Sequence, residues 1–134
     1  MKITRFEPGD DLIIVDGRVW GPTQREERPL KLVVDTGAVE TVIVPEILDE
    51  LGFNPRDGEA ITMMRSAVGC EPGYLIRVPQ FECLGHLACD FRVHAHDLPS
   101  AWNIRGLIGL SFLRQFNYEI RSLEGRICVE RASL

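Results

Sequence analysis

Short apolar runs rich in Val, Ile, Leu and Phe alternate with turn residues along the chain. This pattern predicts a mainly β protein. Asp16-Gly17 stands between the apolar residues 12–15 and residues 18–20, and Asp-Gly in such a place predicts a hairpin turn. Residues 21–29 are polar and contain two prolines, so we expect a surface loop there before a buried strand at residues 30–34.

The remaining strands are predicted to pair as neighbours along the chain. The expected hairpins join residues 61–65 to 74–78 around a turn at 66–73, residues 79–84 to 87–95 around Gly85 and His86, and residues 117–121 to 126–131. The segment 97–105, with Pro99 and Trp102, is expected to be a loop. No repeat or linker interrupts the pattern, which predicts a single domain over residues 1–134.

Two short helices are predicted within this β pattern. Residues 45–52 carry Pro45 at the first helical position and Gly52 just past the end, and the inward-facing residues are expected to be Ile47, Leu48 and Leu51. Ser111 is expected to cap a second helix over residues 111–116.

The strongest candidate for chemistry is the sequence Asp35-Thr36-Gly37-Ala38, which follows strand 30–34 directly and precedes a second apolar strand at 41–44. A buried strand that ends in this way delivers one carboxylate into a tight turn. Asp and Gly also end strands as ordinary turn residues, so a purely structural turn is the alternative. A later apolar strand, residues 106–110, contains Gly109.

In these segments, residues 33–38, 41–45 and 107–113, the chain resembles the retropepsin-like aspartic proteases, the single-lobe relatives of pepsin. The resemblance implies a mainly β, closed barrel with one or two short helices. It also implies that the strand ending at Gly109 lies beside the catalytic loop. Val39 and Leu110 stand where viral members often carry an acid and an arginine, so the chain is more similar to the cellular and bacterial branch.

The resemblance implies an aspartic endopeptidase, in which two carboxylates activate a water molecule for attack on a peptide bond. The chain has one Asp-Thr-Gly motif, so the second carboxylate must be Asp35 of another copy, in a homodimer. Thr36 is expected to reach across the dimer axis, and Gly37 to offer its N–H to the carboxylate. A non-catalytic domain of the same fold, kept for dimerisation or peptide binding, is the alternative.

Residues 61–78 are expected to form a flap over a peptide substrate, although an ordinary surface hairpin would explain the same sequence. Substrate contacts are expected from Ala38 in the turn and, at the flap tip, from Ala67, Val68 and Gly69. Ala38 lacks the hydroxyl that Ser would offer the ionised carboxylates, so activity is expected to reach nearer to neutral pH than in pepsin-like enzymes. Glu40 either lines a substrate subsite or is simply exposed.

Composition narrows the possible partners. The chain is 45% apolar with a net charge of −5, which argues against nucleic acid or an anionic membrane as a partner. The apolar runs are too short to span a bilayer and no signal peptide is visible, so a cytoplasmic location is expected. The four cysteines form no CxxC pair and are expected to be reduced thiols. No cofactor is expected; the alternative is a metal site drawn from Cys83, His86 and Cys89 with His94 or His96.

Overall fold

The computed structural model describes residues 1–58, 60–66, 69–99 and 103–131, with only the backbone of 60–66 and 69–72. The elements follow in the order β1 (Lys2–Arg5), β2 (Ile14–Trp20), β3 (Glu27–Val34), β4 (Val42–Ile43), α1 (Pro45–Glu50), η1 (Pro55–Asp57), β5 (Ala60–Ser66), β6 (Gly69–Cys83), β7 (His86–Ala95), β8 (Gly106–Ile108), α2 (Leu110–Leu113), β9 (Phe116–Arg121) and β10 (Arg126–Arg131).

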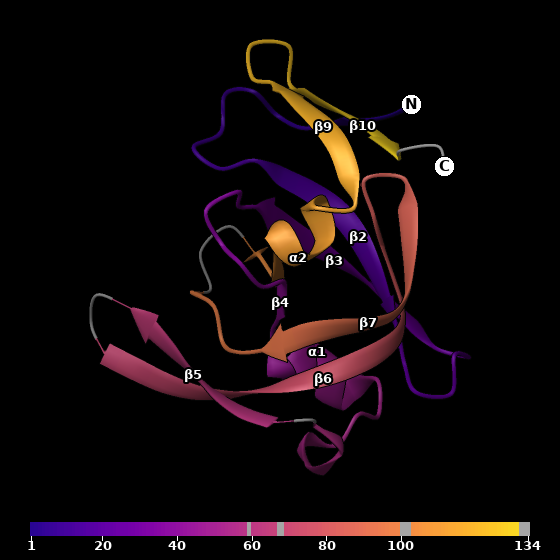
Figure 1. The fold of residues 1–134 in the computed structure, drawn as a ribbon, viewed down its shortest axis with the longest axis vertical. Coiled ribbons are helices and arrows are strands. Elements are labelled where there is room, and N and C mark those ends of the chain that lie inside the picture. The colour runs from indigo at the N-terminus through magenta and orange to yellow at the C-terminus, as the bar shows by residue number, and fades with distance from the viewer. Residues whose placement is uncertain (59, 67–68, 100–102, 132–134) are drawn as a thin grey trace.

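Six strands close into a barrel, in the order β2-β3-β8-β4-β7-β6 and back to β2. Most neighbours are antiparallel, whereas β3 with β8 and β4 with β7 are parallel. Strand β5 pairs with the first half of β6, and this hairpin projects from the barrel (Figure 1). The predicted fold class, a mainly β closed barrel with short helices, is confirmed.

The barrel interior is filled by alternate residues of each strand. In β2, Val15 and Val19 are buried while Asp16 and Arg18 point to solvent, as the two-residue period of a strand requires. The helix α2 contributes Phe112, which is fully buried and meets the ring of Phe81 edge-on at 5.6 Å between centroids. This contact fixes α2, and the residues just before it, against the core.

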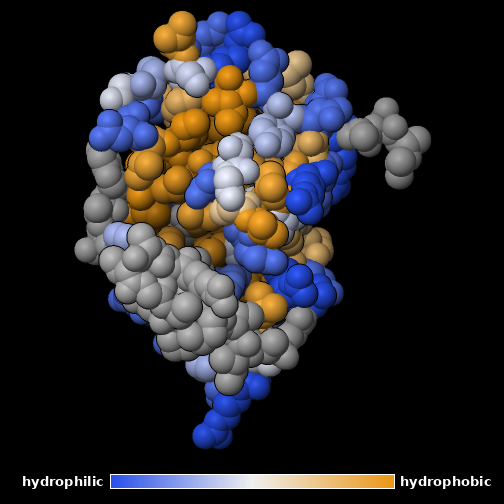
Figure 2. Space-filling model, turned by 60° about the vertical axis from the view of Figure 1, so that its left-hand side comes forward, coloured by the Kyte–Doolittle hydropathy of each residue, from blue (hydrophilic) through white to orange (hydrophobic). Residues whose placement is uncertain are grey.

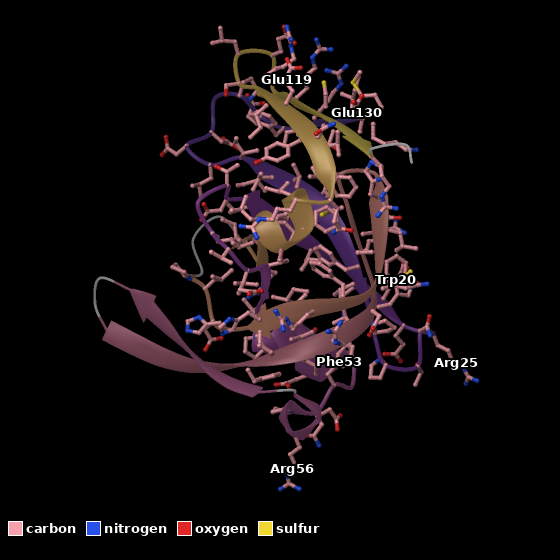
Figure 3. The ribbon with its side chains drawn as sticks, in the orientation of Figure 1. Trp20, Arg25, Phe53, Arg56, Glu119 and Glu130 are labelled. Atoms are coloured by element: carbon pink, nitrogen blue, oxygen red, sulfur yellow. The ribbon has the colours of Figure 1, made fainter. Side chains whose placement is uncertain are left out.

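A separate three-stranded sheet, β1-β10-β9, lies beside the barrel. Its inner face buries Ile127 and Val129, whereas Glu119 and Glu130 are exposed on its strands (Figure 3). The β9–β10 hairpin was predicted from the sequence and is confirmed. The sequence pattern did not indicate β1, which pairs along β10.

The first predicted helix is confirmed. Pro45 opens α1, and Gly52, just past its end, has φ of +97°, a conformation that side chains disfavour. Ile47, Leu48 and Leu51 are all buried, as expected. Neither α1 nor any other helix of the described residues has the length and apolar character of a membrane span.

The predicted hairpin at Asp16-Gly17 is wrong, because both residues lie inside the continuous strand β2. Gly17 is paired on one side with Leu30 of β3 and on the other with Cys83 of β6. A Cβ on Gly17 would overlap the side chain of Leu32, so glycine serves close strand packing there rather than a turn. The connection to β3 lies at residues 21–26, which makes the predicted loop at 21–29 too long.

Other boundaries also differ from the prediction. The strand predicted at 106–110 ends at Ile108, so Gly109 lies between β8 and α2 and not within a strand. The turn predicted at 66–73 is shorter, because β5 runs to Ser66 and β6 already begins at Gly69. The second helix begins one residue earlier and is shorter than predicted, with Gly109 and not Ser111 in the N-cap position. The hydroxyl of Ser111 instead forms a hydrogen bond with Thr41, across the chain. Phe116 already belongs to β9.

Candidate active site

Asp35 stands at the end of β3, where the strand leaves the barrel. Its N–H donates to the carbonyl oxygen of Ile108 at 2.9 Å, which extends the β3–β8 pairing by one residue. Its half-buried carboxylate accepts a hydrogen bond from the N–H of Gly37 at 2.9 Å through Oδ1, and its carbonyl oxygen accepts one from Ala38 N–H at 3.2 Å. The turn therefore holds the carboxylate in one orientation by its own backbone.

The strand β8 and the start of α2 lie against this turn, as the resemblance implied. Leu110 N–H donates to the carbonyl oxygen of Ala38 and Ser111 N–H to that of Val39, each at 2.8 Å. Gly109 lies so close that an added Cβ would overlap the carbonyl oxygen of Glu40. Only glycine allows the two backbones to come this close, which explains why a glycine follows β8 in the sequence.

Asp35 is one of the residues around an open cavity of about 390 Å³. The cavity is lined by Leu12, Val33, Asp35, Leu98, Pro99, Ile104, Gly106 and Leu107. Figure 2, which turns the left-hand side of Figure 1 toward the viewer, shows hydrophobic surface gathered on this side of the molecule. Walls of this kind fit an apolar group and place it next to the acid.

On the other side of the turn the surroundings are polar. Glu40 is half-buried, with its side chain 34% exposed, and lies 4.0 Å from the guanidinium of Arg92. His94 and His96 are buried, with ring centroids 6.1 Å apart. Burial and the neighbouring His96 lower the pKa of His94, while the charge of Glu40 acts in the opposite direction. Glu40 is therefore not simply exposed, and a place for it in a substrate subsite stays a prediction.

The other predicted site residues fall into two groups. Thr36 and Gly37 are exposed beside Asp35, and Ala38 is half-buried in the same turn. Gly69 begins β6 opposite Ser66, whereas Ala67 and Val68 lie outside the described residues. Contact of these three residues with a substrate stays a prediction.

Sequence reasoning missed the hydroxyl pair of Thr41 and Ser111, whose oxygens are 2.9 Å apart although the residues are 70 positions apart in the chain. It also missed the cavity wall formed by Leu98 and Ile104. No local pattern marks these residues, because they come close only in the folded chain. Thr41 precedes β4 and Ser111 follows β8, and these two strands pair with each other.

The cysteines and histidines considered as metal ligands do not converge. Cys83 is buried, and burial raises the pKa of its thiol well above the usual range, whereas Cys89 is exposed. His86 packs its ring on Phe116 at 4.5 Å between centroids. Within the described parts of the chain, no group of three His, Cys, Asp or Glu side chains could hold a metal ion.

Comparison with known proteins agrees with the geometry. The family model described as gag-polyprotein putative aspartyl protease matches residues 22–115. Among solved structures, a retropepsin-like aspartic protease from Rickettsia conorii is similar, with a TM-score of 0.68 and 20% sequence identity over 95% of this chain and 87% of that one. No curated protein sequence matches closely enough to count as a relative.

Proposed function

The chain belongs to the gag-polyprotein putative aspartyl protease family, and from this premise we propose that it is an aspartic endopeptidase that works as a homodimer. The observation that carries the proposal is the position of Asp35. Its carboxylate accepts a hydrogen bond from the N–H of Gly37, Asp35 lines an apolar cavity, and its turn is bonded to the start of α2.

The proposed reaction needs two carboxylates. One, ionised, removes a proton from a water molecule, while the other, protonated, polarises the carbonyl of the peptide bond. Two full charges about 3 Å apart, at an effective dielectric constant of about 20, repel by roughly 5 kcal/mol. A pair at that separation therefore shares one proton and titrates as a unit.

A second copy of the chain is proposed to supply the second carboxylate. The chain has one Asp-Thr-Gly motif, and the exposure of Thr36 and Gly37 leaves their side of the turn accessible to a partner. Val39, in the same loop, is an apolar side chain that is 61% exposed and would be covered in such a dimer. Two-fold symmetry would then place both Asp35 side chains at the axis.

The proposed substrate is a peptide or protein segment bound across this turn. The cavity beside Asp35 would take an apolar side chain of the substrate, and the β5–β6 hairpin would cover it. Neither nucleic acid nor a membrane is proposed as a partner, and the cytoplasmic location stays a prediction from the sequence.

A mixing experiment tests the dimer mechanism directly. Asp35→Asn protein is added in equal amount to wild-type protein, under conditions that allow subunits to exchange, and peptide cleavage is measured. If each active centre needs Asp35 from both subunits, random association lowers the activity per wild-type chain to about half. Unchanged activity after proven exchange would contradict the shared centre.

The Asp35→Asn variant also distinguishes a peptidase from a domain that only binds peptides. Asp35→Asn that still dimerises but no longer cleaves supports a peptidase. A wild-type protein that cleaves no member of a diverse peptide library, while both forms bind peptides equally, would instead indicate a peptide-binding domain.

A further inference from the structure

Two chain segments that are far apart in the sequence meet behind Asp35. The loop from Asp35 to Thr41 lies against the segment from Ile108 to Ser111, and backbone hydrogen bonds join them. These bonds involve Asp35, Ala38 and Val39, which are the first residues of the loop. None of these three bonds holds the other end of the loop, at Thr41 just before β4.

The far end is held by a buried hydroxyl. Thr41 is 0% exposed, and its Oγ1 accepts a hydrogen bond from the N–H of Gly109 at 3.3 Å. The same oxygen lies 2.9 Å from Oγ of Ser111, in a second hydrogen bond. A buried hydroxyl with two partners is satisfied, and removing it would leave the buried Gly109 N–H without its acceptor.

The loop 35–41 and the segment 108–111 are packed closely together. Because a Cβ on Gly109 would overlap the carbonyl of Glu40 and lie 2.8 Å from that of Ala38, the two backbones are already in contact. The Thr41 backbone is fixed too, since its carbonyl oxygen accepts the N–H of His94 at 2.8 Å. A shift at Thr41 therefore passes directly to the turn that carries Asp35.

We propose that Thr41 and Ser111 are positioning residues for Asp35. Their hydroxyl pair locks the end of the loop onto the start of α2, and this lock keeps the N–H of Gly37 aligned with the Asp35 carboxylate. The inference rests on the proposed function, because a carboxylate that shares a proton with its mate needs a fixed orientation. Displacement of a catalytic group by about 1 Å costs roughly 100-fold in rate.

Kinetics of matched variants test the proposal. Thr41→Val keeps the shape but loses the hydroxyl, and should lower kcat roughly 10- to 100-fold with KM changed less than about twofold. Ser111→Ala should cost less, because Thr41 still accepts from Gly109. The double variant should be no worse than about Thr41→Val alone, since both hydroxyls act in one unit.

Conservative and remote controls separate positioning from folding. Thr41→Ser retains the oxygen and should keep kcat within about threefold of wild type. Thr23→Val makes the same chemical change in an exposed loop and should alter neither kcat nor KM. A Thr41→Ser variant as slow as Thr41→Val, at equal melting temperature, would overturn the proposal, as would an unchanged kcat in Thr41→Val.

A second readout does not depend on cleavage. The amide signal of Gly37 follows ionisation of Asp35 by NMR, because this N–H donates to its carboxylate. In Thr41→Val the change of the Gly37 signal with pH should shrink and the amide of Gly109 should exchange faster, while core amides such as Leu32 keep their rates. In Ser111→Ala the change of the Gly37 signal should shrink less, and the amide of Gly109, which still donates to Thr41, should keep its rate. If the pH dependence of the Gly37 signal and the exchange rate of the Gly109 amide are both unchanged in Thr41→Val, the positioning role is overturned. If wild-type protein cleaves nothing while these changes are seen, the proposed function fails and the positioning inference stands.

Discussion

Asp16 and Asp35 each follow apolar residues and have a glycine within the next two positions, yet their surroundings in the fold differ. Asp35 directly follows the end of β3, and its half-buried carboxylate accepts a hydrogen bond from the backbone of its own turn. Asp16 lies in the middle of a strand, with its side chain 80% exposed and paired with Lys31 at 2.6 Å. The same kind of local sequence thus gives a candidate catalytic turn in one place and a solvated strand residue in the other.

The neighbours of each glycine explain the difference. Gly17 is enclosed by strands on both sides, so the chain gains more by continuing its hydrogen bonds than by turning. Gly37 comes after the end of β3, where Val34 pairs with Ile108, the last residue of β8. Tertiary pairing, and not the dipeptide, decides which of the two aspartates is presented at an opening of the barrel.

The largest contrast is expected in cleavage activity. Asp35→Asn keeps the shape of the side chain but removes its ionisation, so kcat should fall by roughly 10²–10⁴-fold. Asp16→Asn makes the same change on the outer surface of β2 and should keep kcat within about twofold. The measurement is peptide hydrolysis by both variants at matched dimer concentration. Comparable losses in the two variants would show that Asp35 is no more important for cleavage than Asp16.

The glycines should show the reverse order in stability. Gly17→Ala is expected to lower the free energy of unfolding by about 1–3 kcal/mol, since its Cβ would overlap Leu32 and lie 2.9 Å from the carbonyl oxygen of Glu82. Gly37→Ala should cost less, because its Cβ would meet only the Asp35 Oδ1 atom at 3.3 Å, a contact that a small displacement relieves. Urea denaturation of both variants checks the order. Equal losses would show that β2 tolerates a side chain at Gly17.

Much of the fold could be predicted from the sequence, because most hairpins join neighbouring strands. The β6–β7 and β9–β10 hairpins and helix α1 follow from local patterns of turn and apolar residues. Contacts between distant segments carry no such local signal. The barrel closes through the β2–β6 pairing, which also makes Gly17 a strand residue, and β1 joins β10 from the opposite end of the chain.

The residues of the candidate site likewise include some that a local motif predicts and others that only the fold brings together. Asp35 and Gly109 could be predicted, since each belongs to a short motif that the family shares. Thr41 and Ser111 could not, because a threonine at a strand edge and a serine near a helix start are ordinary, and only the folded chain brings their oxygens to 2.9 Å. The cavity wall at Leu98 and Ile104 likewise depends on how the segment before β8 packs.

A pH effect is expected behind the Asp35 turn. The pKa of His94 is lowered below its ordinary value of 6.5 by burial and then by His96, with Glu40 acting in the opposite sense. The unfolded chain therefore binds the proton more readily, so stability is complete above that ordinary value and is lost as the pH falls below it toward the folded pKa.

His94→Gln removes this titrating group. The melting temperature should fall on acidification from about pH 7.5 to about pH 5.5 in wild type, and less steeply in the variant. His86, whose pKa is also lowered, chiefly by burial, adds to the slope from its place beside Phe116 of the terminal sheet. Identical slopes in wild type and His94→Gln would show that the region behind Asp35 does not sense pH.

The smallest effect is expected at the surface pair that makes Asp16 so different from Asp35. Lys31 and Asp16 are 51% and 80% exposed, so water screens their attraction although the atoms are only 2.6 Å apart. A double-mutant cycle with Lys31→Gln and Asp16→Asn, measured by urea denaturation, should give a coupling of about 0.2–1 kcal/mol that declines with added salt. A coupling well above that range would mean that the pair holds β2 to β3. Asp16 would then be fixed as firmly as Asp35, and the contrast between the two aspartates would lie only in what each one faces.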